Sequence, residues 1–261
     1  TYKLLIGGEL VAGDMTMDVI NPATEEVLAQ CPRASARQLE TAVAAAKAAF
    51  CAWSRRPVGE RRAMIVDLAD ALNARAGEFS RLLTQEQGKP LAESAAEVAY
   101  SEAFLRHLAS YDLQNRVIED AENRRVEQRR KPLGVVGAII PWNFPLLICA
   151  FKLPLALLAG NTVVIKPAPT TPLATLLLGE LCAKIFPAGV VNVITDNNDL
   201  GAQLGAHPDI AKLSFTGSTE TGRKVMSGAA ATLKRLTLEL GGNDAAIVLA
   251  DANPAKAAAD I

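Results

Sequence analysis

The sequence is poor in the residues that hold metals and disulfides. Its 261 residues include two histidines and four cysteines, and no two cysteines form a CxxC pair. A structural zinc site needs several such ligands at short, regular spacings, so no metal centre is predicted. Nothing resembles a disulfide framework either, which favours a reducing cytoplasm as the location of the protein.

Strong net charge and long apolar runs are also absent. The formal net charge is −1, which argues against binding to nucleic acid. The basic run over residues 123–131 alternates like a strand and is interpreted as a solvated face. The apolar run over residues 145–159 is interrupted by Lys152 and Pro154, so no membrane span is predicted. The opening "TYKLLIGGEL" lacks the cationic region of a signal peptide.

The chain does contain enough apolar mass for a sizeable core. Half of its residues (50%) are hydrophobic, although only 5% are aromatic, and nothing in this composition indicates disorder. The length allows one large domain or two ordinary ones. We divide the chain into an amino-terminal attachment (residues 1–115), a hairpin (residues 116–130) and an α/β domain (residues 131–261).

The attachment is expected to form two hairpins followed by helices. Two glycines at residues 7–8 separate apolar runs, as in the turn of a hairpin, and a similar pattern surrounds residues 21–22. Ser35 and Gln38 have the spacing of a capping box that opens an alanine-rich helix. Two more long helices are expected, the last over residues 91–112, before the polar hairpin.

From residue 131 onwards, short β-branched runs alternate with helical stretches of ordinary length. Repetition of strand and helix predicts a Rossmann-like α/β fold, a parallel sheet with helices on both faces. Ligands of such sheets bind at the carboxyl ends of the strands. The predicted strands lie within residues 133–140, 161–167, 190–195, 211–217, 233–240 and 244–251.

The stretch "FTGSTETG" (residues 215–222) combines a strand end, a glycine and a helix start. Ser218 stands at the expected N-cap, and a helix start with free N–H groups can bind an anion. Gly217 would allow a pyrophosphate to approach the backbone closely. The spacing differs from GxGxxG, so an ordinary capped helix is the alternative.

Two other predicted strands end in residues that could bind a ligand. In "PWNFP" (residues 141–145), prolines stiffen the turn around Asn143. Its amide could donate to a developing oxyanion, although asparagine is also common in turns. Lys166 ends the next strand. It could orient a ribose or phosphate, or it could be an ordinary surface lysine.

Glu239 lies inside the apolar strand pattern of "LTLELGGN" (residues 236–243), directly before two glycines. Burial of an unpaired carboxylate is costly, so its presence in this pattern calls for a reason. A carboxylate beside a partly apolar pocket can act as a general base. The alternative is a strand-end glutamate paired with a lysine or arginine.

Together these motifs occur in a fixed order on successive predicted strands. With them the sequence resembles the aldehyde dehydrogenase superfamily, NAD(P)-dependent enzymes that oxidise aldehydes to acids. The stretches "INPATEEVLA" (residues 20–29), "EQGKP" (residues 86–90) and "PAGVVNVI" (residues 187–194) are also similar to that family. The resemblance extends over essentially the whole chain and implies NAD or NADP as the cofactor.

The resemblance implies a role for each matching residue. Asn143 is expected to be the side-chain donor of the oxyanion hole, and Glu239 the general base that activates water to hydrolyse a thioester. Lys166 is expected to hydrogen-bond the adenosine ribose, and Gly217 and Ser218 to lie against the pyrophosphate. The positions expected to bind the dinucleotide are Ile139, Ile140, Pro141, Trp142, Lys166, Pro169, Gly217, Ser218, Thr221, Leu240 and Gly241.

The sequence departs from the family pattern in two places. Members often have a glutamate three residues after the lysine, where it accepts hydrogen bonds from the ribose hydroxyls, and here that position is Pro169. Without this carboxylate a 2′-phosphate would meet less repulsion, so NAD and NADP both remain open. Residues 196–198 replace a glycine-rich turn near the adenine, so the adenine pocket is expected to differ in shape.

The family's nucleophile is not expected within this chain. In the family the thioester forms on a cysteine a few dozen residues after the glutamate, and this sequence ends at Ile261, before that point. Cys149 lies on a stretch with the pattern of buried core, where cysteine is usually a small hydrophobe. The other cysteines lie far from the motifs. We therefore expect an amino-terminal half that is inactive alone, with the catalytic domain absent.

Two other functions stay open at this stage. The chain could be a truncated, non-catalytic nucleotide-binding or interaction module. It could also be a hydrolase that uses Cys149 or Ser218 with Glu239, although no histidine lies in a motif with them. The partners expected from the resemblance are a small aldehyde in the complete enzyme and further copies of the chain, since residues 116–130 resemble part of the family's oligomerisation flap.

Overall fold

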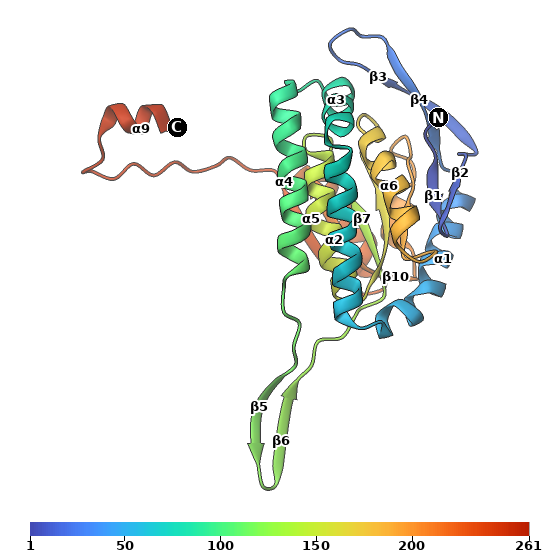
Figure 1. The fold of residues 1–261 in the computed structure, drawn as a ribbon, viewed down its shortest axis with the longest axis vertical. Coiled ribbons are helices and arrows are strands. Elements are labelled where there is room, and N and C mark those ends of the chain that lie inside the picture. The colour runs from blue at the N-terminus through green and yellow to red at the C-terminus, as the bar shows by residue number, and fades with distance from the viewer. Residues whose placement is uncertain (261) are drawn as a thin grey trace.

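The computed structural model describes residues 1–260 (Figure 1), and its main sheet is parallel at its centre. The sheet has seven strands in the order β11-β10-β7-β8-β9-β1-β2. The parallel strands are β7 (Val135–Ile139), β8 (Thr162–Lys166), β9 (Val191–Val193), β10 (Ile210–Gly217) and β11 (Arg235–Leu240). The predicted Rossmann-like α/β fold is therefore confirmed.

The first predicted hairpin extends this sheet. Strands β1 (Leu4–Ile6) and β2 (Glu9–Val11) pair with each other, and β1 also pairs antiparallel with β9 through Leu5 and Val193. Leu4, Leu5 and Ile6 are buried, so apolar burial places this hairpin at the edge of the core. The division of the chain at residues 115 and 130 stays a prediction.

Helices cover both faces of the sheet, and a further helical layer lies outside one of them. Helices α5 (Pro145–Leu158) and α6 (Leu173–Ile185) pack on one face, with α2 (Val58–Ala74), α3 (Ala76–Gln87) and α4 (Leu91–Ala109) outside them. Helices α1 (Ala36–Arg55), α7 (Gly201–Ala206) and α8 (Thr219–Ala230) pack on the other face. We call these the α5 face and the α8 face.

Burial on both faces explains the largely apolar sequences of β7 and β8. Every residue of both strands is buried, because helices cover both of their faces. Strand β10 lies next to β7 on the side away from β8, and β11 lies beyond β10. Strands β8 and β9 follow β7 on one side, whereas β10 and β11 lie on the other side. The strand order therefore reverses between β7 and β10, and their junction is the topological switch point of the sheet.

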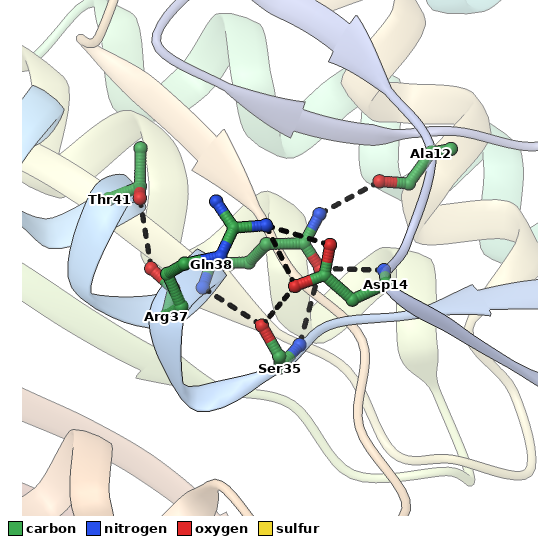
Figure 2. A network of polar contacts seen from close by, with 6 residues as sticks. All are labelled: Ala12, Asp14, Ser35, Arg37, Gln38 and Thr41. Carbon is green, nitrogen blue, oxygen red and sulfur yellow. Dashed lines mark hydrogen bonds and ion pairs between the residues drawn. The ribbon is translucent and has the colours of Figure 1, made fainter.

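The start of α1 is fixed by the predicted capping box (Figure 2). The Ser35 side chain accepts a hydrogen bond from the N–H of Gln38, and the Gln38 side chain accepts one from the N–H of Ser35. Gln38 also donates to the carbonyl of Ala12, and Arg37 and Ser35 both bind the carboxylate of Asp14. The hydrogen bond from Ser35 and the charge of Arg37 lower the pKa of Asp14.

Two more hairpins lie outside the main sheet. Strands β3 (Met15–Ile20) and β4 (Val27–Arg33) form the second predicted hairpin. Strands β5 (Arg116–Ala121) and β6 (Arg124–Gln128) form the predicted polar hairpin, which projects from the body of the molecule (Figure 1). Ile118 at its centre is exposed.

One predicted strand is wrong. Residues 244–250 form no strand, and the side chains of Ile247, Val248 and Leu249 are exposed. A strand needs a partner for its backbone hydrogen bonds, and none of the strands in residues 1–260 pairs with this segment. The segment instead leads away from the body to α9 (Pro254–Asp260), as Figure 1 shows.

Candidate functional site

The motif-bearing strand ends lie side by side at the carboxyl edge of the sheet. Ile139 of β7 is the register partner of Lys166 in β8 and of Phe215 in β10. Gly217 of β10 is the partner of Leu240 in β11. Residues 139, 166, 217 and 240, which the sequence places far apart, are thus brought together at the switch point.

The two faces of this edge carry different residues. Successive side chains of a strand point to opposite faces, and register partners point to the same face. Gly201 of α7 approaches Lys166, and Gly222 of α8 approaches Leu240, so both strand residues lie on the α8 face. Glu239 lies beside Leu240 in sequence and therefore points to the α5 face. The expected cofactor contacts Lys166 and Leu240 and the expected general base therefore lie on opposite faces of the sheet.

The N-terminus of α8 lies directly after β10. Ser218 is its N-cap, and its Oγ accepts a hydrogen bond from the N–H of Thr221 at 3.2 Å. A Cβ at Gly222 would lie 2.5 Å from a methyl carbon of Leu240, so glycine permits this close packing of helix on strand. Ser218 and Thr221 are exposed, which leaves the helix start accessible to an anion.

Lys166 is buried and paired, so it is not a snorkelling surface lysine. Its Nζ lies 2.5 Å from Oδ1 of Asp196, and the two side chains are 5% and 0% exposed. Residue Asp196 follows β9, the neighbouring strand, and its second oxygen accepts the N–H of Leu200 before α7. Pro169, three residues after Lys166, is half-buried and offers no charge.

The turn between β7 and α5 presents two exposed side chains. Trp142 is 60% exposed, and Asn143 is also exposed, so both are accessible to a ligand at this edge. Ile140 and Pro141 precede them, and the N–H of Ile140 donates to the carbonyl of Lys166, which extends the pairing of β7 and β8. Asn143 is therefore available as a side-chain donor.

Lys89 and Glu97 hold this turn in place from the outer helical layer. The Nζ of Lys89 donates to the carbonyl of Asn143 at 2.7 Å and lies 4.0 Å from the ring centroid of Phe144. Lys89 also pairs with Glu97 at 2.6 Å. The other carboxylate oxygen of Glu97 accepts the N–H groups of residues 146 and 147 at the start of α5. One ion pair thus fixes both the turn and the helix after it.

Glu86 performs the equivalent task for α6. Its carboxylate oxygens accept the N–H of Leu173 at 2.7 Å and the N–H of Ala174 at 3.0 Å. Burial raises the pKa of Glu86 to about 8, although these two hydrogen bonds act in the opposite direction. Residues 86–90 match the family pattern in sequence, but neither supporting glutamate is predicted from it. Acidic residues in the buried stripe of a helix are the signal that could have identified them.

Glu239 stands at a cavity on the α5 face. The cavity has a volume of about 680 Å³ and lies between α5 and the strands β10 and β11. Lys152 of α5 lines the same cavity and donates to Ser214 at 2.9 Å. Burial lowers the pKa of Lys152 to about 8, and the charge of Glu239 partly offsets this effect. Glu239 is exposed at the cavity rather than buried in the strand, and sequence reasoning did not single out Lys152 as its neighbour.

The hydrolase alternative has little support in this arrangement. Cys149 is buried, and burial raises the pKa of its thiol to about 12, so it does not offer a thiolate. Ser218 hydrogen-bonds to Thr221 rather than to a histidine. Cys149 is a buried hydrophobe, as the sequence pattern predicts.

One expected contact position, Gly241, lies outside the cluster of strand ends. Gly241 follows the end of β11 in an exposed segment, and no atom lies within 4 Å of a Cβ built on it.

Among the described residues, no group of three or more candidate ligands for a metal ion is found. No helix in residues 1–260 is long and apolar enough to cross a membrane.

Comparison with known proteins identifies the family. The model of the aldehyde dehydrogenase family matches residues 10–261. This chain belongs to the aldehyde dehydrogenase family. A Pseudomonas protein named "probable aldehyde dehydrogenase" is 47% identical over 251 residues, which are 96% of this chain and 51% of that protein.

Solved structures of similar proteins have the same fold. The structure of PnpE in complex with nicotinamide adenine dinucleotide matches 98% of this chain and 54% of its own, with a TM-score of 0.93 and 39% identity. An E. coli NADP-dependent enzyme matches 93% of this chain and 52% of its own, with a TM-score of 0.90 and 37% identity. This member of the family spans about half the length of the curated relatives it matches.

Proposed function

We propose that this chain binds NAD(P)⁺ on the α8 face of its sheet. We further propose that it supplies the oxyanion donor and the general base to a protein that oxidises an aldehyde to a carboxylic acid. The bound nicotinamide supplies the acceptor for a hydride. The chain's own residues bind the dinucleotide, orient the substrate and move a proton.

One observation carries this proposal: the carboxyl ends of β7, β8 and β10 meet at the switch point, next to the N-terminus of α8. Such an edge is where open α/β sheets bind nucleotides. The helix start offers N–H groups to a pyrophosphate, and Lys166 offers an ammonium group near the ribose. The exposed Trp142 and Leu240 border the same edge.

Asn143 and Glu239 take different roles in the reaction. The amide N–H of Asn143 donates to the oxygen that becomes negative when a nucleophile adds to the aldehyde carbonyl. Once the adduct of the aldehyde with a cysteine thiolate has lost its hydride, Glu239 accepts a proton from the water that attacks the resulting thioester. Its position on the α5 face keeps this carboxylate away from the proposed pyrophosphate contacts, so the anionic groups do not repel each other at close range.

The proposal extends to partners and location. The projecting hairpin β5–β6 exposes Ile118 and carries alternating charges, which suits pairing with another copy of the chain. A homo-oligomer formed through this hairpin is therefore part of the proposal. The four cysteines are unpaired, which supports a reducing cytoplasm as the location.

Binding of the dinucleotide can be tested with the two tryptophans of the chain. Trp142 is exposed at the proposed site, whereas Trp53 is 1% exposed in the core. Titration of NADH into the purified chain is expected to quench Trp142 fluorescence in a saturable manner. Trp142→Phe should bind the dinucleotide, measured by calorimetry, but lose the quenching. Absence of binding by the wild-type chain in both measurements would contradict the proposal.

A further inference from the structure

Lys166 and Asp196 form a buried ion pair. The sequence motif that contains Lys166 does not predict this partner. Their side chains are 5% and 0% exposed, and Nζ lies 2.5 Å from Oδ1. The second oxygen of Asp196 accepts the N–H of Leu200 at 2.9 Å. Both oxygens are thus engaged, so the carboxylate is held in one position and faces the ammonium group of the lysine.

The surroundings keep this pair rigid. Asp196 follows Thr195, whose Oγ1 donates to the carbonyl of Pro32 and whose carbonyl accepts the N–H of Ala34. The pair is pinned on one side by the end of β4 and on the other by the start of α7. A Cβ built on Gly201 would lie 3.6 Å from Cε of Lys166, so the lysine stem is packed against α7.

We propose that Asp196 determines the dinucleotide preference of this chain and makes it select NAD⁺ over NADP⁺. The inference rests on the proposed function, in which Lys166 lies next to the adenosine ribose. Asp196 acts through Lys166, because it neutralises the cation and limits its movement towards a ligand. The neutral pair leaves no net positive charge next to the ribose to offset the desolvation of the 2′-phosphate of NADP⁺.

Asp196 is the proposed determinant of the dinucleotide preference because residue 169 carries no carboxylate. Pro169 can neither attract a ribose hydroxyl nor repel a phosphate. If Lys166 were unpaired, its charge would favour the doubly anionic 2′-phosphate. The carboxylate that opposes this preference therefore comes from the loop after β9, thirty residues beyond Lys166 in the chain.

The test compares two aspartate variants of the purified chain. Asp196→Asn removes the buried charge and keeps the shape of the side chain. Asp209→Asn is the matched control. Asp209 also forms an ion pair, with Lys47 at 2.6 Å, but it directly precedes β10 at the opposite, amino-terminal edge of the sheet. Circular dichroism verifies that both variants are folded, and calorimetry measures the affinity for NAD⁺ and NADP⁺.

The wild-type chain is expected to bind NAD⁺ about tenfold more tightly than NADP⁺ or better, since the 2′-phosphate must be desolvated without a net positive charge to bind it. Asp196→Asn should reduce the affinity ratio by roughly tenfold, mainly through tighter binding of NADP⁺. Asp209→Asn should leave the ratio unchanged. A wild-type preference for NADP⁺, or an unchanged ratio in Asp196→Asn, would overturn the inference while the proposed function stands.

Salt dependence provides a second measurement that needs no variant, in case Asp196→Asn does not fold. Salt screens the attraction of a phosphate to an unpaired cation, whereas a neutralised Lys166 attracts the 2′-phosphate little. The preference of the wild-type chain for NAD⁺ should therefore change little as ionic strength rises. A preference that increases with salt indicates net attraction of the phosphate and contradicts the inference. If neither dinucleotide binds under any condition, the proposed function itself fails.

Discussion

Glu86 is a buried carboxylate whose main contacts are two backbone N–H groups at the start of α6. Burial is the largest effect on its ionisation and raises its pKa from 4.5 to about 8. The folded state therefore binds the proton more tightly than the unfolded state. The stabilisation from this proton is complete below the unfolded pKa and is lost as the pH rises towards 8.

We predict that Glu86→Gln removes this pH dependence. Between pH 5.5 and 8, the free energy of unfolding of the wild-type chain should fall relative to the variant, by at most about 1.4 kcal/mol per pH unit. Urea unfolding followed by circular dichroism at several pH values gives the difference. Glu220→Gln is the control, because Glu220 is exposed and pairs only with Lys224 in the same helix. Parallel curves for wild type and Glu86→Gln would disprove the prediction.

At the scale of secondary-structure elements, the turn between β7 and α5 depends on a distant ion pair. Lys89 binds the carbonyl of Asn143, and Glu97 caps α5. The side chain of Glu97 is fully buried, so removal of Lys89 leaves an uncompensated charge. Loss of one partner of a buried pair is much more costly than loss of an exposed one.

We predict that Lys89→Met lowers the free energy of unfolding by about 3 kcal/mol, because Glu97 loses its counter-charge. Lys224→Met breaks an exposed pair in α8 and should cost less than about 0.5 kcal/mol. Chemical denaturation of both variants measures the two effects. The double variant Lys89→Met, Glu97→Gln should recover part of the loss, since no buried charge then remains. Equal effects of the two single variants would contradict this interpretation.

At the scale of the whole molecule, the segment that follows β11 lies outside the packed body. Residues 244–250 leave the body as an exposed segment, and Ile247 is 84% exposed (Figure 1). Proteases cut where the backbone can adopt an extended conformation without breaking other contacts. Ile118 is also exposed, but its strand β5 is paired with β6, which opposes cleavage there.

We predict that thermolysin, which cuts before large apolar residues, cleaves the native chain first within residues 244–250. Intact-mass spectrometry of a time course identifies the first product. Replacement of Ile247, Val248 and Leu249 by serine should slow this cut and leave the rest of the chain unaffected. A first cut inside helices α1–α8, or inside the hairpin β5–β6, would show that this segment is not the least protected part.

The sequence predicts the local features of this protein well, because each depends on neighbouring residues. Continuous β-branched runs predict β7 and β8, and the spacing of Ser35 and Gln38 predicts the start of α1. The order of the strand-end motifs predicts the family and the edge of the sheet where Lys166 and Glu239 lie. Periodicity and turn chemistry act over a few residues, so they can be recognised without a fold.

Long-range contacts could not be recognised in this way. The pairing of β1 with β9, the caps that Glu86 and Glu97 place on α6 and α5, and the binding of Lys166 by Asp196 join residues far apart in the chain. Residues 244–250 show the same limit, because an apolar run becomes a strand only where an edge is available to pair with it. Local pattern fixes what an element is, whereas packing fixes its partners and hence the environment of each charge.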